Sequence, residues 1–446
     1  MTFIPENSES KGRFLSRPII ATIIVGMLLR LVMGLLFSFP DDTQSWALTI
    51  SNFEASGSLY ELAGYYYMPI WGYILGTIDV LGESFGVDQF GTRLIELLPL
   101  ENGESVAYTL IPSVKFSLMF KIGLFICDLA VSYLVWYIVM DRTGDSRKST
   151  IAFILSFLCP LVITACTSQG MFDTIGALLT LLCVVLMMKE HYFLAGSMFA
   201  FATVIKVFPG FLIFLLAAYV LSKHRADKTG VRNLMKAVIG ATISFAIIIM
   251  PQVMEGTLED CFSFLLSRTD TMGGSFGKVI SVATIVLYIA IVAVSILIGR
   301  WMYKSDTDDR NGLLLSLLMV NITIIFLFPA NAQYLVLLVP FLIIQFVTVS
   351  ARYKVPMTIL MISTAIFAMS SGPLNLVSFA EFTGLLDVNS VVSGVQWYIE
   401  PLIGPVSLET IVTCAGVIEY ISLVLILKKF YDVRKDNGGH TPTINM

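Results

Sequence analysis

Long apolar runs follow one another along most of the chain, with short polar segments between them. About 20 apolar residues suffice for a helix to cross about 30 Å of hydrocarbon. The runs are unbroken instead of alternating, which favours helices over the strands of a membrane barrel. We therefore expect an all-α polytopic membrane protein with about 12 transmembrane helices, near residues 18–39, 113–139, 150–168, 171–188, 193–208, 210–222, 234–251, 279–303, 312–330, 333–350, 355–372 and 409–428.

Composition agrees with this pattern. Of 446 residues, 56% are hydrophobic and 13% are charged, with a mean hydropathy of +0.83. These values exclude a soluble fold and make nucleic acid an unexpected partner. The six cysteines lack the paired spacing of a zinc site or a disulfide framework, so we interpret them as small packing residues. No internal repeat divides the chain, and a single membrane domain over residues 1–446 is expected.

The polar segments between the predicted spans are of two kinds, those that are rich in basic residues and those that are long. Basic residues cluster at both chain ends and in alternate loops, at 11–17, 142–148, 189, 223–232, 304–310, 352–354 and 428–435. Basic loops tend to stay in the cytoplasm, so both termini are expected there, in the plasma membrane of a prokaryote or the endoplasmic reticulum of a eukaryote. The long outer segments are then about 40–112, 252–278 and 373–408. The first contains stretches that look like interfacial helices.

Lys206 precedes a predicted break in the membrane helices. The spans near 193–222 are short and are separated by Pro209 and Gly210, which favours two half-length helices beside a cavity. A lysine within a span costs about 2.5 to 3.5 kcal/mol on insertion scales and normally has a use. Near the outer surface it would suit an anionic phosphate. The alternative is a lysine that reaches lipid headgroups without a substrate.

Other polar residues at the outer boundary are further candidates. Gln169 and Asp173 lie in the segment SQGMFDT and would contact a sugar or phosphate. The alternative is turn formation by Gly170 and helix capping by Asp173. Further candidates for substrate contact are Asn331, Gln333 and Tyr334. Further candidates for phosphate binding are Arg268 and Lys121. For Lys121 the alternative is contact with lipid headgroups.

Arg30 and Asp128 are expected to have a different role. Counting the helical rise places both well inside the hydrocarbon. Unpaired charges are costly there, so we expect a structural ion pair or polar network.

Segments that contain polar residues follow one another along the chain in this order: Arg30 in the first span, FPDDTQSWAL (39–48), YYYMPIWGY (65–73), KIGLFICDL (121–129), SQGMFDT (168–174), TVIKVFPG (203–210) and NAQYLVLLVPFL (331–342). Together they resemble the GT-C superfamily of integral-membrane glycosyltransferases, and in particular its mannosyltransferase-like members. The resemblance covers about the first 350 residues, whereas residues 351–446 match only in being helical.

The resemblance implies transfer of a sugar, with mannose expected, from a polyprenyl-phosphate donor to a glycan, lipid or protein acceptor, with inversion. It implies that an aspartate of the first outer loop is the general base, and the spacing to Trp46 favours Asp42 over Asp41. An attacking alcohol needs such a carboxylate within hydrogen-bond reach. The alternative is an N-cap for a helix beginning near Thr43. Trp46 and Tyr67 would contact substrate, and no metal or other cofactor is implied.

Two features depart from the family, and two other classes compete, of which a non-catalytic lipid-binding or scaffold protein would not need the acidic loop or Lys206. Many members have two prolines after the tyrosines, whereas this chain has Met68 and Pro69, and no histidine falls in a predicted outer segment. A secondary transporter is the stronger alternative, because about 12 spans with both termini inside is also a transporter plan. The fragment MDRTGDSRK (140–148) partly matches a transporter loop, but Tyr137 stands where that loop has glycine.

Overall fold

The structure is a computed structural model that describes residues 14–60, 65, 67–88, 90–100, 103–267, 275–327, 331–370, 383–385 and 408–437. All twelve segments predicted from the sequence contain a described helix. Within the described ranges, six helices are long and apolar enough to cross a membrane: Arg17–Leu36, Val114–Thr143, Ser146–Ser168, Gly230–Glu255, Ile285–Lys304 and Thr410–Asp436. Several shorter apolar helices accompany them. The chain is therefore an integral membrane protein.

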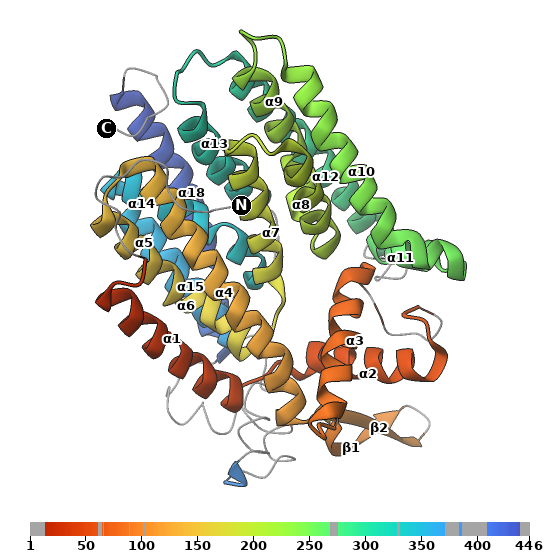
Figure 1. The fold of residues 1–446 in the computed structure, drawn as a ribbon. Helices are drawn as coiled ribbons and strands as arrows, with labels where there is room; N and C mark the ends of the chain where they lie inside the picture. Colours follow the sequence, from red (N-terminus) through yellow and green to blue (C-terminus); the bar gives the residue numbers. More distant parts are fainter. Residues whose placement is uncertain are drawn as a thin grey trace.

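Four elements gather at one end of the helix bundle, at the lower right in Figure 1. After α1 (Arg17–Leu36), these are α2 (Pro40–Ser56), α3 (Pro69–Ser84), β1 (Phe90–Leu100) and β2 (Gly103–Pro112). We call this the site end. Helix α3 contains IWGYILGTIDVLG (70–82), one of the stretches expected to be interfacial helices.

The hairpin of β1 and β2 departs from the all-α expectation. The strands pair antiparallel, with Ile95 opposite Tyr108. The sequence carries a signal for it, because the dipeptide Asn-Gly at 102–103 is a sequence pattern typical of hairpins and stands between two runs that contain strand-favouring residues. Hydropathy analysis of membrane spans does not register such a signal.

The remaining helices form two packed groups (Figure 1). The first group consists of α4 (Val114–Thr143), α5 (Ser146–Phe157), α6 (Pro160–Val162), the π-helix η1 (Ile163–Ser168), α7 (Asp173–Met188), α13 (Arg310–Ile325), η3 (Ala332–Leu337), α14 (Val339–Thr348), η4 (Ala351–Tyr353), α15 (Lys354–Ser370) and α18 (Leu408–Asp436). The second consists of α8 (Tyr192–Ile205), η2 (Phe208–Leu212), α9 (Ile213–Lys223), α10 (Gly230–Glu255), α11 (Leu258–Ser267) and α12 (Ser275–Lys304).

In the first group, α4 packs on α5 and α7, and α15 packs on α18. In the second group, α10 packs on α8, and α12 packs on α9. The two groups are joined where α7 packs on α8.

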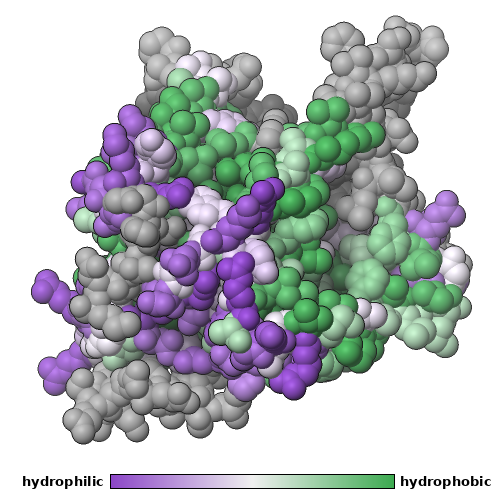
Figure 2. Space-filling view, turned by 90° about the horizontal axis from the view of Figure 1, so that it is seen from above, coloured by the Kyte–Doolittle hydropathy of each residue, from purple (hydrophilic) through white to green (hydrophobic). Residues whose placement is uncertain are grey.

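Basic loop residues gather at the opposite end of the bundle, which we call the basic end. Lys189 pairs with Asp141 at 2.8 Å, and Lys223 pairs with Glu190 at 3.1 Å. Arg142 pairs with Asp309, from a loop far along the chain. Figure 2, seen from this end, shows hydrophilic residues gathered beside hydrophobic flanks. The loops predicted for one side of the membrane are thus brought together by these ion pairs.

Two hydrophobic cores fill the described structure. The larger lies inside the helix bundle. The smaller lies at the site end and joins α2, α3 and α4 to the segment before α7 and to the end of α8. Its large rings, which we call the aromatic cluster, are Trp46, Tyr65, Trp71, Phe116, Phe120 and Phe172. This cluster brings together segments that are far apart in the sequence.

Candidate active site

Lys206 marks the break between α8 and η2. It is the C-cap residue of α8 and has extended backbone angles, φ −145° and ψ 136°. Pro209 lacks an amide donor and disfavours helix in the residue before it, which explains why α8 ends here. The break between half-length helices is therefore confirmed, with η2 as its short connection.

The Lys206 ammonium lies in a cage of aromatic rings. Its Nζ is 4.3 Å from the ring centroid of Phe172, 5.0 Å from Tyr334 and 5.5 Å from Tyr67. Asp173 Oδ1 lies 3.3 Å from the same nitrogen. Only 11% of the lysine side chain and 5% of the aspartate side chain are exposed. Aromatic faces attract a cation, so the cage and the carboxylate together stabilise the charge.

The segment from η1 to α7 places Asp173 beside this lysine. The chain turns at Gly170, whose φ is +80°, and a Cβ there would lie 2.8 Å from Phe120 Cε2. Asp173 follows as the first residue of α7, where the positive end of the helix dipole favours a carboxylate. Gln169 is buried and donates from Nε2 to Ala368 O at 2.7 Å. Turn formation by Gly170 is thus confirmed, whereas helix capping by Asp173 is wrong, because the N-cap of α7 is Phe172. Substrate contact by Asp173 stays a prediction.

Phe172 lies at the centre of the site. Its ring stacks on Trp71 at 4.5 Å and contacts the Trp46 ring edge-on at 6.1 Å. It also contacts Tyr67 at 5.1 Å. One ring therefore separates the Lys206 ammonium from the tryptophans of α2 and α3. Sequence reasoning did not single out Phe172, because a phenylalanine in an apolar chain carries no distinguishing signal.

The acidic pair lies in the first turn of α2. The helix begins at Pro40, with Phe39 as N-cap, so the expectation that one aspartate caps a helix beginning near Thr43 is wrong. The amide of Phe39 donates to Gln169 O at 3.4 Å, which ties this turn to the segment that carries Asp173. Asp42 is half-buried and precedes Trp46 by one helical turn, on the same face. The side chain of Asp41 lies outside the described residues.

The loop before α3 is fixed by its tyrosines. The Tyr65 hydroxyl donates to Met68 O at 2.8 Å and accepts from the Gly72 amide at 2.7 Å. Burial raises the pKa of this hydroxyl well above its ordinary value, so it stays protonated and keeps both bonds. Tyr60 donates to Tyr67 O at 2.8 Å and supports the residue that borders Lys206.

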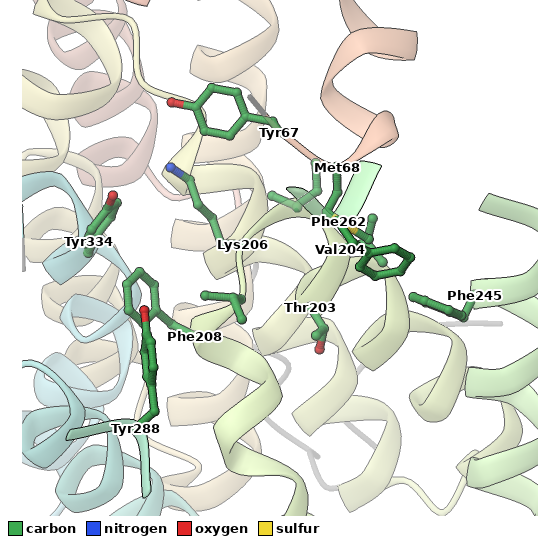
Figure 3. Close-up of a pocket in the computed structure, with 12 residues that line it drawn as sticks. Tyr67, Met68, Thr203, Val204, Lys206, Phe208, Phe245, Phe262, Tyr288 and Tyr334 are labelled. Atoms are coloured by element: carbon green, nitrogen blue, oxygen red, sulfur yellow. The ribbon is translucent and has the colours of Figure 1, made fainter. Parts of the chain in front are cut away.

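An apolar pocket of about 180 Å³ adjoins Lys206 (Figure 3). Its wall combines residues of α8, η2, α10, α11 and α12 with Tyr67 and Met68. Figure 3 shows the Lys206 amine pointing toward Tyr67, with Phe208 and Tyr334 on one side and Phe245 on the other. Tyr288 is 37% exposed. The aromatic residues Phe208, Phe245, Phe262 and Tyr288 were not predicted, since they come from separate helices without a shared motif.

Residues 331–334 lie against the same site. Tyr334 is 7% exposed and borders both Lys206 and the pocket. Gln333 Nε2 lies 3.7 Å from Met171 Sδ, in the segment that precedes Asp173. Asn331 is exposed at the start of η3.

Two other predicted cations behave differently. Lys121 is fully buried, and its Nζ donates to the carbonyls of Gly34 (3.0 Å), Phe37 (2.5 Å) and Ser168 (3.4 Å). These bonds satisfy carbonyls at the ends of α1 and η1, which favours a structural role over phosphate binding. Arg268 lies outside the described residues.

The buried pair of Arg30 and Asp128 is confirmed. Arg30 Nε lies 3.0 Å from Asp128 Oδ2, and neither side chain is more than 1% exposed. Thr174 donates to Asp128 Oδ1 at 2.6 Å. Because Thr174 follows Asp173, this network holds the first turn of α7 against α4.

One group of carboxylates lies apart from Lys206. Glu54, Asp79 and Glu83 have oxygens within 4.8 Å of one another at the ends of α2 and α3. Exposed acidic groups of this kind are common without an ion. They do not change the expectation of a reaction without a metal.

A protein-family model matches the middle part of the chain. The model of glycosyltransferase family 87 matches residues 109–329. The matched range includes Asp173, Lys206 and much of the pocket wall. No curated protein matches the chain. Neither the match nor the described geometry favours the transporter, and the family match and the apolar helices together support a membrane glycosyltransferase.

Proposed function

We propose that this protein transfers a hexose, with mannose as the first sugar to test, from a polyprenyl-phosphate donor to an acceptor hydroxyl. The observation that carries the proposal is the position of Lys206. It is a largely buried cation at the head of an apolar pocket, beside the segment that carries Asp173. A lipid-linked phosphate needs this combination of a cation for the headgroup and apolar surface for the chain.

The pocket wall gives the lipid a path to the bilayer. Helices α10 and α12 contribute Phe245 and Tyr288 to the wall. The same helices expose apolar residues such as Ile247 and Ile289, at 67% and 63%. In a membrane protein these exposed faces would contact lipid tails. An isoprenoid chain would leave the pocket between these two helices, with its phosphate at Lys206.

This arrangement supports the following reaction. The acceptor hydroxyl attacks the anomeric carbon while Asp42, or Asp41, takes its proton. The bond from the anomeric carbon to the phosphate oxygen breaks, and its electron pair stays on the phosphate. Lys206 stabilises that growing charge. The products are the glycosylated acceptor and a polyprenyl monophosphate, and the aspartate returns its proton to water.

The donor class sets the other requirements. A phosphodiester-linked sugar already carries its leaving group, so the proposed reaction needs no metal or other cofactor. The acceptor would enter beside α2, at the end of the bundle opposite the basic loops. The positive-inside rule makes the basic end cytoplasmic and the site end extracytoplasmic or lumenal.

The donor class is tested with the purified full chain in liposomes. Radiolabelled mannose is supplied as polyprenyl-phosphate mannose or as GDP-mannose, together with a lipid and glycan extract from membranes that lack the enzyme. Label should pass to product only from the polyprenyl-phosphate donor. Transfer from GDP-mannose alone would contradict the proposal, as would label that crosses the bilayer unchanged without any product.

A further inference from the structure

We infer that the basic end holds a binding site for one anionic phospholipid, between the loop that follows α9 and the end of α12. The headgroup would be bound by Arg225, Arg300 and Lys304, and the acyl chains would lie along α12. The site lies away from Lys206, so the inference goes beyond the proposed transfer reaction and does not depend on it.

The first observation is a stripe of exposed residues along α12. Ile289 and Ile296 are 63% and 45% exposed. Spacings of three, four and seven residues place them on the same helix face as Arg300, Tyr303 and Lys304, which are also exposed. The stripe is therefore apolar along the span and basic where the span ends at Lys304. A phospholipid has the same arrangement, with apolar chains beside a charged headgroup.

The second observation is that Arg225 reaches this face from another element. Its Cζ lies 4.6 Å from the centroid of the Tyr303 ring. Helices α9 and α12 are close together, since a Cβ on Gly299 would lie 2.7 Å from Phe214 O. Stacking on a ring uses the face of the guanidinium and leaves the N–H groups in its plane available to a phosphate. Two elements therefore bring their cations to one place.

The third observation is that no carboxylate pairs with these cations. Among the described residues, none of the three forms an ion pair. Asp227, two positions after Arg225, lies 3.1 Å from His224 Nδ1 instead. Asp306, two positions after Lys304, is exposed and forms no ion pair. The positive charge on this face is thus left for a ligand.

The depth and charge of the site select the ligand. Arg300 lies about 6 Å before Lys304 along the helix, so its stem faces lipid and its charged group needs an anion at headgroup level. Guanidinium groups suit the two-pronged contact with phosphate oxygens. The headgroup of phosphatidylcholine adds a cation of its own, whereas that of phosphatidylglycerol has a net negative charge. We therefore expect the anionic lipid to be preferred.

The test measures lipid binding to the full-length protein in detergent by native mass spectrometry. Phosphatidylglycerol and phosphatidylcholine with the same acyl chains are titrated separately. The unmodified protein should bind its first phosphatidylglycerol about tenfold more tightly than phosphatidylcholine. Glycerol phosphate, which lacks acyl chains, should not displace the lipid. Equal affinities for the two lipids would overturn the inference, and displacement by glycerol phosphate would assign the site to a soluble ligand instead.

Variants distinguish a built site from diffuse charge. Arg225→Gln combined with Arg300→Gln should weaken phosphatidylglycerol binding about tenfold and leave phosphatidylcholine binding within about twofold. Arg147→Gln combined with Lys148→Gln is the matched control, because it removes the same charge at the start of α5, in the other helix group. The control should bind both lipids as the unmodified protein does. An equal loss in the two double variants would overturn the site in favour of diffuse charge.

A variant that keeps every charge tests the stacked arrangement. Tyr303→Leu should weaken phosphatidylglycerol binding about threefold, because Arg225 loses the ring that positions it. Its affinity for phosphatidylcholine should not change. If Tyr303→Leu binds phosphatidylglycerol as the unmodified protein does, the site built from Arg225 and α12 is wrong.

Discussion

The ammonium of Lys206 lies 3.3 Å from Asp173 Oδ1 although 33 positions separate the two residues in the sequence. The contact forms because α7 and α8 pack side by side. Asp173 is the first residue of α7 and Lys206 is the C-cap of α8, so the start of one helix lies beside the end of the other. Phe172, Tyr67 and Tyr334 complete the surroundings of the cation. The contact therefore joins two segments that the sequence had marked separately.

Replacing Asp42 tests its role as the base. Asp42→Asn keeps the size of the side chain and should lower kcat about 100- to 10,000-fold, because proton transfer loses its acceptor. Donor affinity should stay within about twofold, since the substitution leaves Lys206 in place. Steady-state kinetics with polyprenyl-phosphate mannose and fluorescence titration with farnesyl-phosphate mannose measure the two quantities. Unchanged kcat would remove Asp42 from the mechanism and direct attention to Asp41.

The apolar pocket wall should determine affinity for the lipid chain. Phe245→Ala should weaken binding of farnesyl-phosphate mannose about tenfold, because a buried aromatic surface against the isoprenoid is lost. Ile247→Ala is the matched control on the lipid-facing side of the same helix, where the side chain is 67% exposed. Equal affinities for the two variants would place the lipid elsewhere.

The contact between α8 and α10 should be sensitive to single methyl groups. A Cβ on Gly196 would lie 1.8 Å from Ala237 O, so Gly196→Ala must push the helices apart. We expect a loss of about 1–3 kcal/mol in stability, as for overpacked interiors. Gly123→Ala is the control, since its Cβ would meet no atom within 4 Å. Thermal unfolding in detergent should show a lower midpoint for Gly196→Ala alone.

Some of the fold and site could be predicted because each signal was local. Pro209 and Gly210 predicted the helix break, and buried-charge costs predicted the pairing of Arg30 with Asp128. The apolar wall could not be predicted, because Phe245 and Tyr288 resemble any other membrane-helix aromatics until the helices pack. Lys121 is a candidate for phosphate or headgroup contact from the sequence, because the sequence does not reveal the carbonyls that surround its amine.

Binding of the donor to Lys206 is the most direct test of the account. Farnesyl-phosphate mannose is titrated into the unmodified protein, Lys206→Met and the control Lys189→Met, whose lysine pairs with Asp141 at the basic end. Loss of a charge-assisted contact should weaken binding to Lys206→Met about 10- to 100-fold. Lys189→Met should bind as the unmodified protein does. Equal affinity of Lys206→Met and the unmodified protein would contradict the central claim that this lysine holds the donor phosphate.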